Sequence, residues 1–98
     1  MARVVLSARA FGDLERILEF IAASDPGRAQ EAVHKIRDAV LILEQHPMLG
    51  RQVEEGRREL VMGRGSDAYP AFYRWVPAGE VILVLAVRNA REAGYQGE

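Results

Sequence analysis

Three residues with charged or reactive side chains follow an apolar run near the C-terminal end of the sequence. The run covers residues 81–87, and Arg88, Arg91 and Tyr95 come after it. A strand that delivers two guanidinium groups and a phenol at its end could form a binding site, because the arginine fork matches carboxylates and phosphates. Strands also end in polar residues for structural reasons alone, so the residue types leave both interpretations open.

Arginine supplies almost all the positive charge of this 98-residue chain. Lys35 is the single lysine among 13 basic residues, and the formal net charge is −1. From residue 57 to residue 91, six arginines stand against three acidic residues, a local net charge of +3. The local positive charge favours an acidic partner. The net charge of the whole chain, by contrast, is too close to zero to indicate nucleic-acid binding. Arginine also keeps its proton at neutral pH, which makes it a poor general base.

Cysteine, metal and membrane chemistry have no support in the sequence. The absence of cysteine excludes disulfides, thiolate metal sites and cysteine nucleophiles. His34 and His46 are twelve positions apart, without the i, i+4 spacing of a helical zinc site. We therefore expect no metal and no cofactor. No signal peptide is visible and no segment approaches the ~18 apolar residues of a membrane span, so we expect a cytoplasmic location away from membranes.

Two helices are predicted from apolar residues that recur every three or four positions. Ser7 can cap the first helix, and Asp25 the second, with Pro26 at its first position and Pro47 beyond its end. Asp13 falls outside the apolar stripe of the first helix. The stripes comprise Phe11, Leu14, Ile17, Leu18 and Ile21 in the first helix and Ala29, Ala32, Val33, Ile36, Val40 and Leu43 in the second. Because few residues separate the helices, they should form an antiparallel hairpin.

Four strands complete the predicted fold. Their β-branched and aromatic residues lie at 3–7, Arg57–Met62, Tyr69–Val76 and Val81–Val87, with a polar loop at 48–56 and a tight turn at Pro77–Gly79. The last strand lacks alternation, which is typical of a strand covered on both faces or central in a sheet. The order β-α-α-β-β-β predicts one α+β domain over residues 1–98. In it, the helix hairpin packs on one face of a small, twisted, mainly antiparallel four-stranded sheet, in spatial order 1-4-3-2.

Short motifs are spread along the chain in a fixed order. They are Asp13-Leu14 in the first helix, His46-Pro47-x-x-Gly50 after the second, Arg58-Glu59-Leu60 and Tyr73-Arg74 in the strands, and Val87-Arg88-Asn89-Ala90-Arg91-Glu92-Ala93-Gly94-Tyr95 in the tail. Together they resemble the RelE/ParE family of toxins from type II toxin–antitoxin systems, the plasmid stabilisation type. In many relatives the tail is similar to V-R-H-Q-R-E-A-G-Y. The resemblance implies a RelE/ParE-like fold and a small bacterial growth-arrest protein, held inactive by an antitoxin encoded beside it.

The resemblance implies one of two activities. ParE-like members poison DNA gyrase and have no accepted catalytic residues. RelE-like members cleave mRNA on the ribosome with a lysine pair on the second strand and three further residues. Carried over, Arg74, Arg91 and Tyr95 match those three, and Arg58 is a further catalytic candidate. The lysine pair is absent. Arg57 and Arg58 occupy that strand, and because strand neighbours point to opposite faces, at most one can replace a lysine.

The missing lysines and the near-neutral charge favour the ParE-like function, growth arrest through DNA gyrase without catalysis. Two alternatives stay open: a ribosome-dependent mRNA endoribonuclease of the RelE type, and a non-toxic binding module of the same fold. In each case we expect a hetero-oligomer with the antitoxin, whose amphipathic helix or strand would cover the open sheet face and the hairpin groove. Acidic residues of the antitoxin would then meet Arg57, Arg58, Arg74, Arg88 and Arg91.

Overall fold

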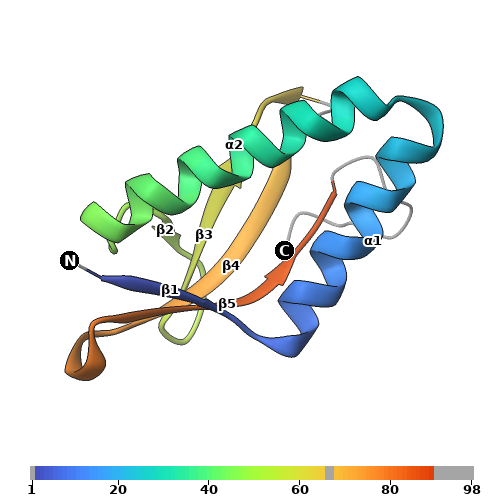
Figure 1. Cartoon of the computed structure of the whole chain (residues 1–98). Coiled ribbons are helices and arrows are strands. Elements are labelled where there is room, and N and C mark those ends of the chain that lie inside the picture. The colour runs from blue at the N-terminus through green and yellow to red at the C-terminus, as the bar shows by residue number, and fades with distance from the viewer. Residues whose placement is uncertain (1, 66–67, 90–98) are drawn as a thin grey trace.

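The computed structural model describes residues 2–65 and 68–89, and its elements follow the predicted order (Figure 1). They are β1 (Arg3–Leu6), α1 (Ala8–Ser24), α2 (Pro26–Gln45), β2 (Arg51–Gln52), β3 (Arg57–Met62), β4 (Tyr69–Val76) and β5 (Val81–Val87). One sheet joins the strands in the order β1-β5-β4-β3-β2. β1 runs parallel to β5, and the other neighbours are antiparallel. The α+β architecture and the spatial order of the four longer strands confirm the prediction.

A short fifth strand was not predicted. Arg51 and Gln52 lie inside the segment expected to be a loop, and they pair with Glu59 and Arg58 of β3. Two residues are too few for an alternating pattern to identify a strand. The sheet therefore ends in β2, which brings residues 51–56 alongside the charged start of β3.

Both helices lie over the same face of the sheet, as Figure 1 shows. The predicted caps are present: Ser7 Oγ accepts the N–H of Ala10 at 3.0 Å, and Asp25 Oδ1 accepts that of Arg28 at 3.2 Å. Asp25 alone separates α1 from α2, so the hairpin is tight. The opposite face of the sheet carries no helix among the described residues, and we call it the second face.

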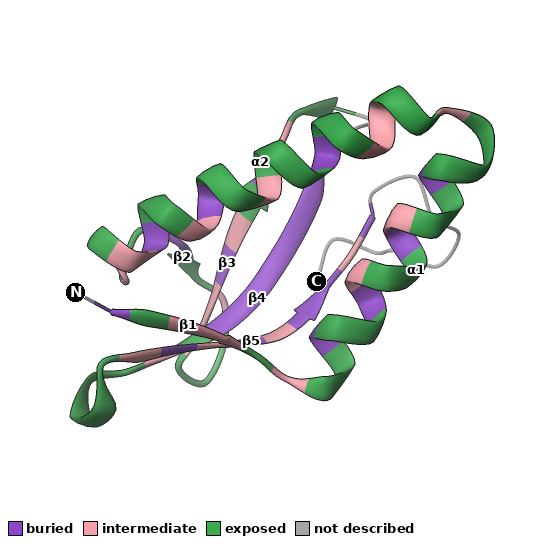
Figure 2. Cartoon of the chain, viewed as in Figure 1, coloured by how far each residue is buried: buried purple, intermediate pink, exposed green. Residues whose placement is uncertain are grey.

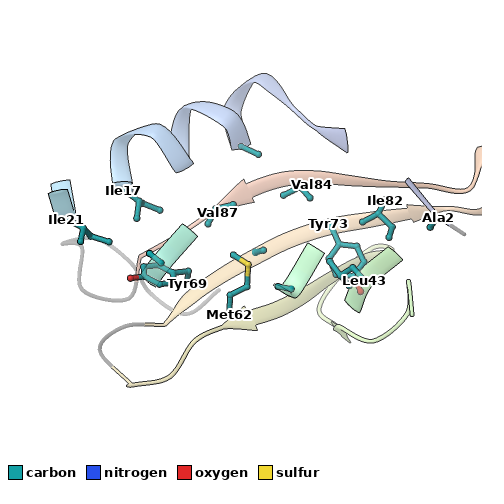
Figure 3. Close-up of a cluster of buried hydrophobic side chains, with 14 residues drawn as sticks. Ala2, Ile17, Ile21, Leu43, Met62, Tyr69, Tyr73, Ile82, Val84 and Val87 are labelled. Carbon is teal, nitrogen blue, oxygen red and sulfur yellow. The ribbon is translucent and has the colours of Figure 1, made fainter. Parts of the chain in front are cut away.

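The core fills the layer between the helices and the sheet (Figures 2 and 3). Ile17 and Ile21 of α1, Leu43 of α2 and Tyr73 of β4 are buried there together with Ile82 of β5. β4 is buried over its first five residues, consistent with its place at the middle of the sheet. Burying each large apolar side chain contributes about 1.5–3 kcal/mol, so this layer holds the hairpin against the sheet.

The start of α1 faces the sheet differently from the prediction. Phe11 was expected in the apolar stripe but is 56% exposed, whereas Ala10 is fully buried. Asp13, expected outside the stripe, is buried as well. Its Oδ2 accepts the backbone N–H of Val87 at 3.0 Å. This polar contact with β5, which periodicity cannot reveal, fixes the rotation of the helix about its axis.

β5 lies inside the sheet between β1 and β4, one of the two alternatives expected for it. Its burial alternates along most of its length, and a β-bulge interrupts it. Tyr73 of β4 pairs with Val84, but Phe72 pairs with Ala86, which leaves Leu85 as the extra residue. An extra residue reverses the alternation beyond it. Val87 therefore joins the core-facing side, and Ala86 lies on the second face beside Phe72.

Candidate functional site

Two of the predicted arginines lie side by side on the second face. Arg57 of β3 is the cross-strand partner of Arg74 of β4. The guanidinium of Arg57 lies 5.6 Å from the ring centroid of Phe72, also on this face, which is a cation–π distance. Arg74 is exposed, whereas Phe72 is buried beneath its neighbours. The pair therefore offers two forked cations, one of which lies over an aromatic ring.

The turn between β2 and β3 binds both of these arginines. Arg57 Nη2 donates to Glu54 Oε1 at 2.8 Å, and Arg74 Nη1 donates to the carbonyl oxygen of Glu55 at 2.8 Å. Glu55 and Gly56 have φ angles of 45° and 78°, which glycine adopts freely and glutamate does at a cost. This backbone places the Glu55 carbonyl against Arg74.

Arg58 is separated from this pair. It is the cross-strand partner of the buried Tyr73, so it lies on the helix-facing side of the sheet. Its Nη1 donates to the carbonyl oxygens of Met48 at 3.2 Å and Gly50 at 2.8 Å. The predicted rule that Arg57 and Arg58 point to opposite faces holds, and Arg58 ties down the loop that follows α2.

Tyr73 binds the same loop, which follows α2, from the buried side. Its hydroxyl donates to the carbonyl of Pro47 at 2.8 Å and accepts the N–H of Gly50 at 2.9 Å. Burial raises the pKa of the Tyr73 phenol, and the bond from Gly50 and the charge of Arg58 oppose that rise. A Cβ on Gly50 would lie 2.8 Å from the Tyr73 ring and hydroxyl. The His46-Pro47-x-x-Gly50 motif thus provides the backbone groups that bind the Tyr73 hydroxyl.

Glu59 is a site residue that the sequence analysis did not single out. Its side chain is only 4% exposed, and its Oε1 lies 2.7 Å from Arg51 Nη2. It pairs across the strands with Phe72, so it shares the second face with Arg57 and Arg74. The signal available in the sequence was the alternation Arg57, Glu59 along the strand, which places both on one face.

The remaining predicted residues lie at or beyond the end of β5. Arg88 donates its backbone N–H to the carbonyl of Pro70 at 2.8 Å. Pro70 and Arg74 are four positions apart in β4, about 13 Å along the strand, so Arg88 is not adjacent to the arginine pair. Arg91 and Tyr95 lie outside the described residues.

An apolar groove runs between the helices on the other side of the molecule. Its volume is about 320 Å³, and it is lined by Leu18, Glu19, Ala22, Ala29, Gln30 and Val33. Alanines at two of these positions keep the helices close and the groove shallow. Within residues 2–65 and 68–89, no cluster of three side chains could hold a metal ion, and no helix is long and apolar enough to span a membrane.

Comparison with known proteins identifies the family. Residues 4–94 match the family described as "ParE toxin of type II toxin-antitoxin system, parDE". The chain belongs to this family. Toxin RelE3 of Caulobacter vibrioides is 29% identical over 92 residues, which are 94% of this chain and 98% of that toxin.

Solved structures of toxin–antitoxin systems share the fold of this ParE-family chain. A structure of the chromosomal ParDE system of P. aeruginosa has a TM-score of 0.73 at 27% identity, covering 91% of this chain and 96% of that one. The toxin–antitoxin complex RelBE2 of Mycobacterium tuberculosis has a TM-score of 0.63 at 19% identity, with 93% of each chain covered. At that identity the likeness concerns the fold alone. Similarity thus extends to both named branches, ParE and RelE, of the toxin family.

Proposed function

We propose that this chain arrests bacterial growth by inhibiting DNA gyrase in the cytoplasm, and that a cognate antitoxin neutralises it. One observation carries the choice of gyrase over RNA cleavage: the arginine pair on the second face has no lysine beside it. The only lysine, Lys35, belongs to α2 on the opposite side of the sheet. The proposed activity therefore depends on binding through this face.

RNA cleavage through a 2′-hydroxyl needs a group that removes its proton. The guanidinium groups of Arg57 and Arg74 stay protonated at neutral pH. Two carboxylates lie at this face: Glu59 is nearly buried and ion-paired with Arg51, and Glu54 is ion-paired with Arg57. Arg58, the other strand candidate, donates to loop carbonyls on the far side of the sheet. This arrangement is suited to holding an acidic group and poorly suited to accepting a proton.

A ribosome-dependent endoribonuclease is the second candidate function. Arg57 and Arg74, cross-strand partners on the second face, could hold a phosphate of the RNA between two guanidinium groups. A relative that covers almost the whole chain carries the name Toxin RelE3. The candidate catalytic residues under this alternative are Arg74, Arg91, Tyr95 and Arg58.

Purified gyrase separates the two functions. With the chain added at increasing concentration, supercoiling of relaxed plasmid should fall, and mRNA in a reconstituted translation reaction should stay intact. Undiminished supercoiling together with cut mRNA would establish the RelE-type function instead. Expression of the chain without its antitoxin tests the third alternative, a non-toxic binding module. Cells would then grow normally, whereas a toxin would arrest them.

The antitoxin is proposed to occupy the groove between α1 and α2. Leu18, Ala22, Ala29 and Val33 provide an apolar floor for an amphipathic helix. The two solved structures described above are of toxin–antitoxin systems, which supports a hetero-oligomer. Copurification of the chain with the small protein encoded beside it tests this pairing directly.

A further inference from the structure

The arginine pair of the second face is already partly occupied by the chain itself. Glu54 Oε1 and Arg57 Nη2 lie 2.8 Å apart, three residues from one another in sequence. The Arg57 side chain is 31% exposed and that of Glu54 is 69% exposed. A ligand that approaches Arg57 from solvent therefore meets a carboxylate that is already bound there.

The turn is built so that this carboxylate stays in place. Its backbone closes with two hydrogen bonds, from Arg57 N–H to the Glu54 carbonyl at 2.9 Å and from Val53 N–H to the Arg57 carbonyl at 3.0 Å. A Cβ on Gly56 would lie 3.2 Å from Arg74 Nη1, so the turn contacts the second arginine as well. The Glu54 side chain is tethered within reach of Arg57 by this closed turn.

The two contacts differ in how much positive charge they leave for a ligand. Arg74 is bound by a neutral carbonyl oxygen, so its positive charge is not cancelled. Arg57 is bound by a carboxylate, which cancels its charge locally. An exposed ion pair of this kind is worth at most about 1 kcal/mol, so a carboxylate of a partner can displace Glu54 reversibly.

We propose that Glu54 is an intramolecular competitor for Arg57, which a carboxylate-bearing peptide segment must displace to bind Arg57 and Arg74. Under the function proposed above, that segment belongs to the antitoxin. Glu54 then sets the affinity of the toxin for its acidic partner and weakens the binding of any peptide with fewer carboxylates. This inference rests on the proposed function only for the identity of the partner.

Glu54→Gln tests the competition because it removes the charge and keeps the size of the side chain. Glu31→Gln, at an exposed position of α2 on the opposite side of the sheet, makes the same change in net charge and is the matched control. Arg57→Ala and the double variant Glu54→Gln/Arg57→Ala complete a double-mutant cycle. Each full-length variant is titrated with two probes, a decaglutamate peptide and the protein encoded beside this chain.

Glu54→Gln should tighten the binding of both probes by about two- to fivefold, the range that one exposed ion pair allows. Glu31→Gln should have a clearly smaller effect, and in the Arg57→Ala background Glu54→Gln should have none. Equal effects of Glu54→Gln and Glu31→Gln, or a gain that persists without Arg57, would overturn the proposal. If the neighbouring protein does not bind the wild-type chain, the proposed antitoxin pairing fails, and the decaglutamate titration still decides the role of Glu54.

Discussion

Tyr73 is fully buried, and its surroundings give it a structural role. It stands next to Arg74 in the Tyr-Arg motif, but the two side chains point to opposite faces of the sheet. The Tyr73 hydroxyl is bound to Pro47 and Gly50. The motif therefore joins a buried residue of the core to an exposed residue of the second face.

The raised pKa of Tyr73 predicts a loss of stability in alkali. The folded chain holds the phenolic proton more tightly than the unfolded chain, whose tyrosine pKa is about 10. The stabilisation is therefore complete below pH ~10 and is lost as the pH rises through the raised folded value. Tyr73→Phe should cost about 1–3 kcal/mol at pH 8, from the two lost hydrogen bonds. It should also lose less stability than wild type between pH 8 and pH 11.

Urea unfolding at both pH values measures this difference. Wild type is the control for general alkaline destabilisation, because every other titrating group is the same in the two proteins. If Tyr73→Phe and wild type lose equal stability in alkali, the Tyr73 proton does not contribute to the pH dependence of folding.

At the scale of elements, α1 is joined to β5 by polar contacts as well as by the core. Ser7 Oγ donates to the carbonyl of Leu85 at 3.1 Å, and Asp13 accepts the N–H of Val87. One contact is made to the bulge residue Leu85 and the other is made two residues beyond it, and both satisfy backbone groups where β1 no longer pairs with β5. They hold the end of β5 in the position from which Arg88 follows.

Asp13→Ala should destabilise the fold by about 1–3 kcal/mol, because it leaves the buried Val87 N–H without an acceptor. Asp13→Asn should cost less, since an amide oxygen can accept the same bond. Glu15→Ala, exposed on the same helix, is the control and should change stability by less than about 0.5 kcal/mol. Urea unfolding gives the stabilities, and hydrogen exchange at Val87 should accelerate in Asp13→Ala. Equal stabilities for Asp13→Ala and Glu15→Ala would show that this contact is dispensable.

The groove between the helices allows a sharp test of antitoxin docking. Ala22 and its neighbour Ala23 are both exposed, but only Ala22 lines the groove. Ala22→Arg should fill the groove and weaken antitoxin binding by at least about tenfold, because an apolar helix would meet a charged side chain. Ala23→Arg changes charge and helix propensity equally and should bind almost as wild type. Calorimetric titration of both variants measures the difference, and equal affinities would place the antitoxin elsewhere.

Across the whole molecule, the sequence predicted what depends on local patterns. The caps at Ser7 and Asp25 follow from residue types beside apolar periodicity. The opposite orientations of Arg57 and Arg58 follow from strand alternation, which needs no knowledge of the neighbouring strand.

Features that depend on contacts between two segments could not be predicted from local patterns. The burial of Asp13 depends on Val87, 74 positions away. The bulge at Leu85 depends on the register with β4, and the pairing of Arg51 with Glu59 depends on a two-residue strand. Each of these depends on how one segment pairs with or packs against another, which the residue types within a single segment do not determine.

The two proposed binding regions lie on opposite sides of the sheet, so their contributions to antitoxin affinity should be independent. Ala22→Arg alters the helix groove, and Arg74→Ala alters the second face; we expect the double variant to equal the sum of the single effects within about 0.5 kcal/mol. Arg74→Ala should also reduce the salt dependence of binding, since it removes an exposed charge. Titrations of wild type, the two single variants and the double variant at two salt concentrations measure both effects.

A coupling energy above about 1 kcal/mol would mean that one segment of the antitoxin contacts both the groove and the second face. An unchanged affinity for Arg74→Ala would mean that the antitoxin stays on the helix side and leaves the arginine pair open to the target.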